Sequence, residues 1–323
     1  TEVSAGTSSA GSDPVTQGAG PAESIAGSAR SARLRETIRN ILAQRSAQVG
    51  LVILTILIAS AILAPVIAPY DPEDPLNGPG EPGRRAEPCI HLLGCPEDQM
   101  QTYLGTDGNS RDIFSRVIWG GRLSIPLGPV VVGFAIILGA IIGSVAGFVG
   151  GMTDNLLMRG MDIVLSFPAL ILAIAIVTVL GIGLINSVAA VVIVSIPLYA
   201  RLTRSAVLST RENDYVTASR ALGESSSGIL RRRVIPNSIT PLIVAGSLGI
   251  ATAVLEVAAL SFLGLGVQPP TPEWGSMIGE NFNSIFNFPI LVLAPAFMLT
   301  MLVLGFNLLG DGLRDALDPR LNR

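Results

Sequence analysis

The chain has 323 residues, of which 49% are hydrophobic and only 14% are charged, with a formal net charge of −3. A soluble domain usually carries about 25% charged residues, so this deficit predicts an integral membrane protein. All 21 basic residues are arginine, which excludes a standard P-loop ATPase because its phosphate-binding motif requires a lysine. The single histidine, His91, excludes histidine-rich metal motifs, and neither a metal site nor a cofactor is predicted for this chain.

Residues 1–46 are predicted to form a cytoplasmic tail. Up to about residue 29 the composition is rich in Ser, Gly, Ala, Thr and Pro, which is typical of disorder. No apolar h-region follows until beyond residue 48, so the tail is not predicted to be a signal peptide. The arginines from Arg30 to Arg45 either set topology or let a basic amphipathic helix lie on anionic lipid.

The apolar segments are long enough to cross a membrane, since about 20 residues that each rise about 1.5 Å span a hydrocarbon core of roughly 30 Å. We expect a first transmembrane helix within 47–70 and a five-helix core within 125–310, with kinks at Pro168 and Pro197. The six segments are Val49 to Pro69, Ile125 to Phe148, Leu157 to Gly183, Val188 to Leu202, Ile239 to Leu265 and Phe288 to Leu309. The predicted fold class is therefore all-α.

Glycines recur every four residues in the second apolar segment, at Gly139, Gly143 and Gly147. This spacing places small residues on one helix face and permits close helix contact. The contact can lie within the monomer or between subunits, and we expect it within the monomer.

The placement of arginine predicts the orientation of the helices. With both termini in the cytoplasm, the arginines that fall outside are only Arg84, Arg85, Arg111, Arg116 and Arg122 of the 21. The opposite orientation would reverse this bias. The segment 71–124 is therefore expected to be extracytoplasmic, and the loop 203–237 and the C-terminal tail 311–323 are expected to be cytoplasmic.

The extracytoplasmic segment contains the only cysteines of the chain, Cys89 and Cys95, in the run Cys-Ile-His-Leu-Leu-Gly-Cys. An oxidising compartment favours a disulfide between them, which would pin this loop. A weak metal site that includes His91 is the alternative.

A long polar stretch, Arg211 to Asn237, separates apolar segments in the second half of the chain. Asp214 to Leu222 has the periodicity of a helix, which Gly223 ends or bends. One side of this helix is formed by Tyr215, Ala218, Ala221 and Leu222. Such a helix either presents a surface of small residues to a partner or is an ordinary loop whose arginines set topology.

One acidic residue, Glu256, interrupts the apolar run Ala251 to Leu260. An acid within a transmembrane segment is energetically costly unless it faces a cavity or a partner. Glu256, with Ser261 and Phe262, is predicted to line a translocation path or gate. The alternative is a structural hydrogen bond from Glu256 to a neighbouring helix.

The polar stretch resembles the EAA loop of binding-protein-dependent ABC importers, with Asp214-Tyr215 in place of the literal Glu. In that family the loop forms coupling helices that dock into a cleft on a separate ATPase subunit. The resemblance implies that the ATPase-coupling residues are Asp214, Tyr215, Ala218, Ser219, Ala221, Leu222, Gly223, Ile229 and Pro236.

Three further stretches resemble the peptide and nickel branch of this family. Tyr103 to Ser124 resembles the signature that precedes the permease core, although Ser110 stands where glycine is usual. Locally, Asp107 or Asn109 is expected to cap a helix there. Glu256 to Ile278 and Gly310 to Pro319 are similar to signatures of dipeptide and oligopeptide permeases. The first of these implies a loop that faces the binding protein, with Gln268, Pro269, Pro270, Trp274 and Gly275.

Together these stretches identify the chain as similar to the C-type permease subunits of peptide importers. The resemblance implies a type I ABC importer permease fold and a non-catalytic, multi-pass subunit of the bacterial cell membrane. The implied partners are a second homologous permease, two ATPase subunits or one fused ATPase that bind ATP and Mg, an extracytoplasmic substrate-binding protein, peptide substrate and membrane lipid, with no nucleic acid.

Di- or oligopeptides are the expected cargo, with nickel complexes or glutathione as alternatives. An intramembrane serine enzyme would need a Gly-x-Ser-x-Gly elbow or an intramembrane histidine, and the sequence contains neither. A stand-alone secondary carrier would leave the polar stretch Arg211 to Asn237 without a role.

Overall fold

The computed structural model describes residues 39, 43–78 and 80–317. The predicted tail 1–46 and the end of the predicted tail 311–323 lie largely outside these residues. Within the described ranges every regular element is helical, and the backbone pairing of a β type is limited to two isolated bridges.

In this described part, five helices are long and apolar enough to cross a membrane. They are α2 (Arg45–Ile62), α4 (Ile113–Val149), α7 (Leu184–Arg211), α11 (Thr240–Phe262) and α13 (Ile290–Leu317). A sixth crossing exists only if α5 (Gly151–Leu165) and α6 (Ala169–Leu180), which are bent by 93° relative to each other, form one broken span.

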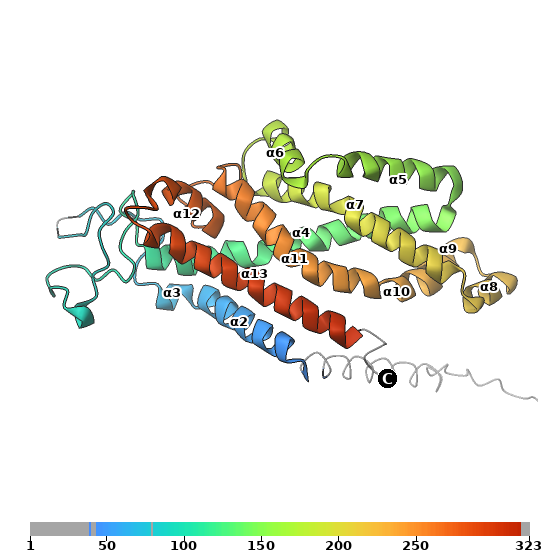
Figure 1. Cartoon of the computed structure of the whole chain (residues 1–323), viewed down its shortest axis with the longest axis horizontal. Coiled ribbons are helices and arrows are strands. Elements are labelled where there is room, and N and C mark those ends of the chain that lie inside the picture. The colour runs from blue at the N-terminus through green and yellow to red at the C-terminus, as the bar shows by residue number, and fades with distance from the viewer. Residues whose placement is uncertain (1–38, 40–42, 79, 318–323) are drawn as a thin grey trace, which may run out of the picture.

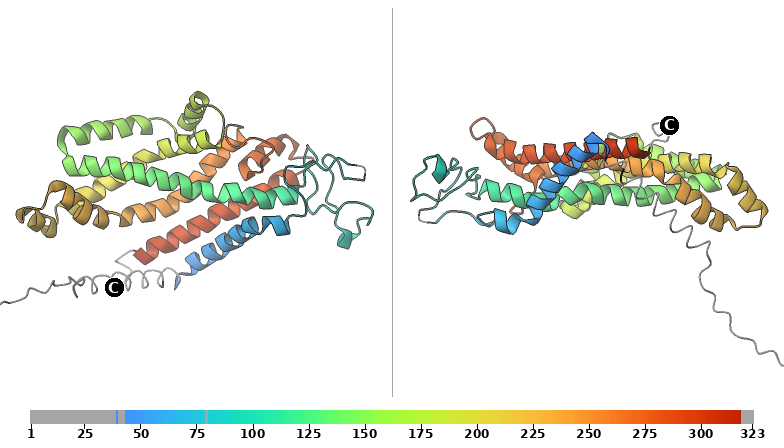
Figure 2. Two further views of the ribbon diagram at one scale, coloured as in Figure 1. Left: turned by 180° about the vertical axis from the view of Figure 1, so that it is seen from behind. Right: turned by 90° about the horizontal axis from the view of Figure 1, so that it is seen from below.

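The long helices lie side by side in an elongated bundle, with α5 and α6 along one edge and α2 and α13 along the opposite edge (Figure 1). One end, which we call the α12 end, carries α12 (Trp274–Asn281), α3 (Ala64–Ile67) and the segment that precedes α4. The other end, the α8 end, carries α8 (Asp214–Ala221) and α9 (Ser226–Ile229). Figure 2 shows the same separation from behind and from below. The remaining short elements are η1 (His91–Leu93), the π-helical turn η2 (Leu230–Val234), α10 (Ile235–Ser238) and η3 (Phe282–Ser284).

The apolar segments mark the long helices correctly but not their ends. α4 begins at Ile113 rather than at Ile125, so the expected boundary at residue 124 falls inside a helix. Asp112 caps this helix, because its Oδ2 accepts a hydrogen bond from the Ser115 amide at 2.7 Å. The expectation that Asp107 or Asn109 is the cap is therefore wrong.

Proline has different effects in the two segments where a kink was expected. The expected segment 157–183 is not a single helix, because Pro168 separates α5 from α6 at the 93° bend. α7, in contrast, continues through Pro197 to Arg211, beyond the expected end at Leu202.

Glycines allow α4 and α7 to touch along their backbones, within the monomer as expected. A Cβ atom at Gly143 would lie 2.2 Å from the Ala200 carbonyl oxygen, and one at Gly139 would lie 2.7 Å from the Tyr199 Cβ. A Cβ at Gly147 would lie 2.9 Å from a carbonyl oxygen of α7. We call these three positions the glycine seam; it makes α4 and α7 a closely packed pair.

Two hydrophobic clusters form the core. One joins α4, α6, α7 and α11, and the other joins α2, α4, α11, α12 and α13. α5 has no buried residue, and α6 buries only Ala173 and Val177. This edge instead exposes large apolar side chains: Met152, Leu156, Ile163, Ile171 and Val179.

Candidate functional site

The polar stretch at the α8 end folds into a short helix that packs on a small hydrophobic core. The side of α8 predicted from its periodicity is exposed, and Leu222 just beyond it is 89% exposed. On the opposite side, Val216 packs into a small core with Val207, Ile229 and Val234. Gly223 adopts a φ of 80°, the left-handed region that favours glycine, where the chain leaves the helix.

This geometry changes the expected roles of two coupling residues. Ser219 is 8% exposed and Ile229 is 1% exposed, so both face the interior of the chain. They support α8 and do not belong to its outer surface. The exposed members of the predicted set are Asp214, Tyr215, Ala218, Ala221, Leu222, Gly223 and Pro236.

The end of α7 connects α8 to the rest of the bundle. Only Glu212 and Asn213 separate the two helices. The Arg211 guanidinium donates a hydrogen bond to the carbonyl oxygen of Gly147 on α4 at 2.8 Å. The Ser238 hydroxyl of α10 donates one to Thr210 Oγ1 of α7 at 3.0 Å.

A polar pocket of about 520 Å³ lies between α5 and α7 near the α8 end. Arg204 pairs with Asp154 through two contacts, of which Nη2 to Oδ2 measures 2.6 Å, and Arg201 pairs with Asp162. Arg159, which also lines this pocket, forms no ion pair with any residue that the structure describes. Sequence reasoning missed these pairs because each joins residues from two separate helices.

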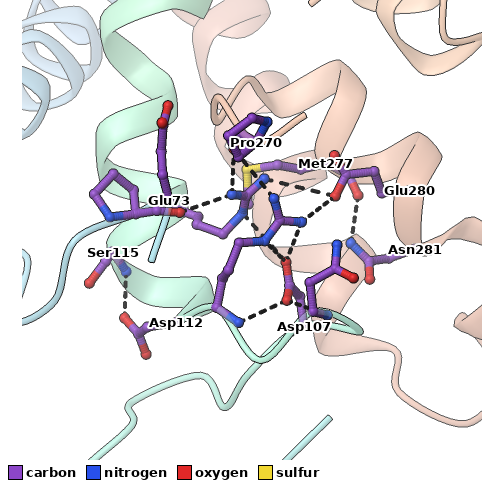
Figure 3. A network of polar contacts seen from close by, with 12 residues as sticks. Glu73, Asp107, Asp112, Ser115, Pro270, Met277, Glu280 and Asn281 are labelled. Carbon is purple, nitrogen blue, oxygen red and sulfur yellow. Dashed lines mark hydrogen bonds and ion pairs between the residues drawn. The ribbon is translucent and has the colours of Figure 1, made fainter. Parts of the chain in front are cut away.

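A buried ionic network holds the α12 end together (Figure 3). Arg111 contacts Asp107 Oδ2 and Glu280 Oε2, each at 2.7 Å. Arg116 donates to the carbonyl oxygens of Pro72 at 2.9 Å and Pro270 at 2.8 Å. The segment between α3 and α4, the first turn of α4, the loop after α11, and α12 are thus joined through two guanidinium groups.

The residues of this network are almost inaccessible to water. The side chains of Arg111, Arg116 and Asp107 are 4%, 1% and 2% exposed, and that of Glu280 is 21% exposed. Both arginines and the aspartate stand in the stretch Tyr103 to Ser124, but no sequence pattern indicates that the arginines contact Glu280. The composition of this segment predicts only that it is too polar to lie in lipid. In the structure, both arginines and the aspartate are buried, and they form ion pairs with one another and with Glu280.

Two residues near this network carry local features of their own. Burial raises the pKa of the Asp112 carboxyl, while hydrogen bonds from Ser115 act to lower it, and Asp112 Oδ1 has no hydrogen-bond partner. Ser110 adopts a φ of 65°, which is the backbone conformation that glycine adopts most readily. Ser110, which stands where glycine is usual, is therefore in a strained backbone conformation.

Glu273 and Trp274 anchor α12 to α4. The Glu273 carboxylate accepts hydrogen bonds from the amides of Gly275 and Ser276, both at 2.9 Å, and from the Ser124 hydroxyl at 3.1 Å. Burial raises the pKa of Glu273, while these hydrogen bonds act to lower it. The Trp274 indole donates to the Val117 carbonyl oxygen at 2.8 Å.

Two residues of the predicted partner-facing loop are therefore buried. Trp274 has no exposed surface, and a Cβ at Gly275 would lie 2.4 Å from the Ala258 carbonyl oxygen. The expectation that these two residues face a partner is wrong, since both pack against the bundle. Gln268, Pro269 and Pro270 are exposed.

The loop before α4 is closed by a disulfide between Cys89 and Cys95, whose Cα atoms lie 5.4 Å apart. Cys89 also pairs through its backbone with Thr102, with hydrogen bonds of 2.8 and 2.9 Å. His91 instead contacts the Gln99 carbonyl oxygen, at 2.7 Å. The described residues include no group of three or more His, Cys, Asp or Glu side chains that could hold a metal ion.

The three residues expected at a path or gate lie in different surroundings. Glu256 is half-buried on α11. Ser261 is 2% exposed and accepts a hydrogen bond from the Val267 amide at 3.4 Å, so it holds the turn after α11 rather than facing water. Phe262 packs edge to face against Phe282, with ring centroids 5.3 Å apart.

Known proteins and protein families match this chain over most of its length. The family described as "binding-protein-dependent transport system inner membrane component" matches residues 135–323, and the N-terminal TM domain of oligopeptide transport permease C matches residues 33–79. The dipeptide transport system permease protein of Alkalihalophilus pseudofirmus is 41% identical, with 89% of this chain and 90% of the relative covered.

Other relatives are also transport system permease proteins. The di/tripeptide transport system permease protein of Pseudomonas aeruginosa is 43% identical over 89% of this chain and 92% of its own length. The glutathione transport system permease protein of Pectobacterium atrosepticum is 39% identical over 89% and 91%. Among solved structures, an inward-facing conformation of the MetNI methionine ABC transporter has the same fold, with a TM-score of 0.51 at 19% identity, over 64% of this chain and 98% of that one. The chain is thus a membrane protein that belongs to the family of binding-protein-dependent transport system inner membrane components.

Proposed function

We propose that this chain is a C-type permease subunit of a type I ABC importer that moves di- or oligopeptides into the cytoplasm, driven by separate ATPase subunits. The observation that carries the proposal is α8, a short helix that exposes Tyr215, Ala218 and Ala221 and whose inner side rests on its own small core. A helix held in this way can transmit a push or pull from a partner as a rigid body.

The peptide cargo is supported by the relatives with dipeptide and di/tripeptide names, which are 41% and 43% identical. The glutathione relative keeps that cargo as the alternative within the same family. The chain would not bind ATP or Mg itself, since its lack of lysine excludes the usual phosphate-binding loop. Both would be held by the ATPase subunits.

The proposed topology has six transmembrane crossings, with α5 and α6 as one broken crossing, and both termini in the cytoplasm. Two independent features support it. The α8 end gathers arginines, including the run Arg231 to Arg233, as the cytoplasmic side of a membrane protein does. The opposite end carries the Cys89–Cys95 disulfide, which belongs in an oxidising compartment.

Each remaining partner has a surface that fits it. The exposed apolar side chains of α5 and α6, which bury few residues within this chain, are available to a second permease. The exposed residues Gln268, Pro269 and Pro270 at the α12 end are available to an extracytoplasmic binding protein. The exposed apolar side chains of the long helices would contact membrane lipid.

The test is co-purification of the tagged chain from its native membranes in mild detergent. Wild type should retain an ATPase with a P-loop motif, a second permease and a binding protein. Ala218→Trp, on the exposed side of α8, should lose the ATPase while remaining in the membrane. Arg220→Trp is the matched control, because Arg220 is exposed and residues two positions apart in a helix point about 160° apart.

Recovery of wild type alone and in stable form would contradict the proposal and favour a stand-alone carrier. Equal ATPase recovery with Ala218→Trp and wild type would contradict the docking of α8 specifically. The ligand bound to the recovered binding protein would decide between peptide and glutathione.

A further inference from the structure

α5 is joined to the bundle more loosely than any other long helix. It has no buried residue. At one end it begins at Gly151, directly after Gly150, and the φ values of 59° and 73° at these two residues lie in the region that favours glycine. At the other end the chain turns by 93° at Pro168. The helix is therefore a short rod between two sharp turns.

The contact of α5 with α7 is polar and open. Where the glycine seam leaves no room for a Cβ between α4 and α7, α5 and α7 instead border a pocket of about 520 Å³. The Asp154–Arg204 pair crosses this pocket with side chains 13% and 34% exposed. The second pair, Asp162–Arg201, is 56% and 52% exposed, so water screens it more strongly.

The arginines at the end of α7 contact both sides of the turn between α4 and α5. Arg211 donates to the Gly147 carbonyl oxygen, three residues before the turn at Gly150, whereas Arg204 holds Asp154, just after it. Residues seven apart lie on the same face of a helix, so one side of α7 makes both contacts. α7 leads directly into α8.

We propose that Asp154 and Arg204 form the joint through which a displacement of α8 reaches α5, so that α5 turns about Gly150–Gly151 while the glycine seam keeps α4 and α7 together. Both residues would affect transport through the position of α5 relative to α7. The inference rests on the proposed function, because it needs an ATPase that moves α8.

The experiment uses the complete importer reconstituted in proteoliposomes, with ATP hydrolysis and uptake of a radiolabelled dipeptide measured in the same preparation. Asp154→Asn and Arg204→Gln should hydrolyse ATP at a rate within about twofold of wild type and take up peptide about tenfold more slowly, a typical size for coupling between sites. The charge-exchange variant, Asp154→Arg with Arg204→Asp, should regain much of the uptake. Asp162→Asn is the matched control on the same helix and should change uptake by less than about twofold, as expected of an exposed pair.

Uptake at the wild-type level in Asp154→Asn would overturn the inference, and so would equal losses in Asp154→Asn and Asp162→Asn. A parallel fall of hydrolysis and uptake in both single variants would also overturn it, since that result indicates a structural role only. If the single variants do not assemble, the charge-exchange variant decides: coupled uptake supports the joint, and assembly without uptake contradicts it. Failure of the proposed function would look different, because wild type itself would then show no ATP-dependent uptake.

Discussion

The two ends of the molecule use ion pairs in opposite ways. At the α12 end, Arg111 and Arg116 are at most 4% exposed and hold segments from four parts of the chain. Toward the α8 end, the arginines of the Arg201–Asp162 and Arg233–Glu224 pairs are each 52% exposed. A buried ionic network makes a structure rigid, whereas exposed pairs are worth about 0–1 kcal/mol and exchange easily with water.

This difference fits the two tasks of an importer permease. In the assembly that we propose, the binding protein docks at the α12 end, which would give it a platform of fixed shape. The ATPase docks at the α8 end, where exposed ion pairs would let it move part of the chain.

Arg111→Gln should destabilise the protein severely, because it leaves Asp107 buried without one of its guanidinium partners. Removal of one partner of a buried ion pair costs about 3–5 kcal/mol. Arg201→Gln, at the other end, should cost at most about 1 kcal/mol. Thermal unfolding of the purified protein in detergent measures both, and similar losses in the two variants would remove the contrast between the ends.

Gly143→Ala should be the next most damaging change, because its Cβ would lie 2.2 Å from the Ala200 carbonyl oxygen. Overpacking of this kind costs about 1–3 kcal/mol or more. The control is Gly133→Ala on the same helix, where a Cβ meets nothing within 4 Å. The control should be neutral or slightly stabilising, since alanine is favoured over glycine in a helix by about 1 kcal/mol. Equal behaviour of the two variants would argue against a rigid α4–α7 pair.

Asp112→Asn should change the pH dependence of stability. Burial raises the pKa of Asp112, so the folded chain holds this proton more tightly than the unfolded chain does. The associated stability is present below the unfolded pKa of about 3.9 and is lost as the pH rises through the folded pKa. Asparagine caps a helix about as well as aspartate but does not titrate.

The unfolding midpoint of Asp112→Asn, relative to wild type, should therefore rise between pH 4 and pH 8. A constant difference between the two proteins across this range would contradict the assignment of the shift to Asp112.

Ser110→Gly should give the smallest effect, a stabilisation of up to about 1 kcal/mol. Glycine removes the strain of a left-handed residue, which is about 1–2 kcal/mol, but loses part of this gain through the greater freedom of the unfolded chain. It also removes the Ser110 hydroxyl, which is buried without a hydrogen-bond partner. Differential scanning fluorimetry would detect the rise in melting temperature, and a fall would show that the hydroxyl has a structural role.

The sequence predicted those features that depend on local periodicity. The exposed side of α8 and the glycine seam both follow from residues three or four apart on one helix. The apolar pattern placed the start of this membrane helix at Ile125 instead of Ile113, because polar residues such as Arg116 and Ser124 interrupt the pattern. They are buried by Pro270 and Glu273, which lie about 150 residues away in the chain.

The same reason explains the misplaced site residues. Trp274 looks like an exposed aromatic in a proline-rich loop, but Val117 of α4 accepts its indole hydrogen bond. Ser219 lies beside Ala218 in the motif, yet Ser219 is buried and Ala218 is exposed. A motif identifies a functional segment, whereas tertiary contacts decide which of its residues face the partner.

The central claim, a fixed α12 end and a movable α5, can be tested by distances between spin labels in the reconstituted importer. One pair of labels joins α5 to α4, at Asn155→Cys and Phe134→Cys. A second pair joins exposed positions at the α12 end, Leu92→Cys and Phe286→Cys. Distances are compared without nucleotide and with ATP and vanadate. Our account predicts that the α5–α4 distance changes while the distance at the α12 end does not. A constant α5–α4 distance in an importer that transports peptide would contradict it.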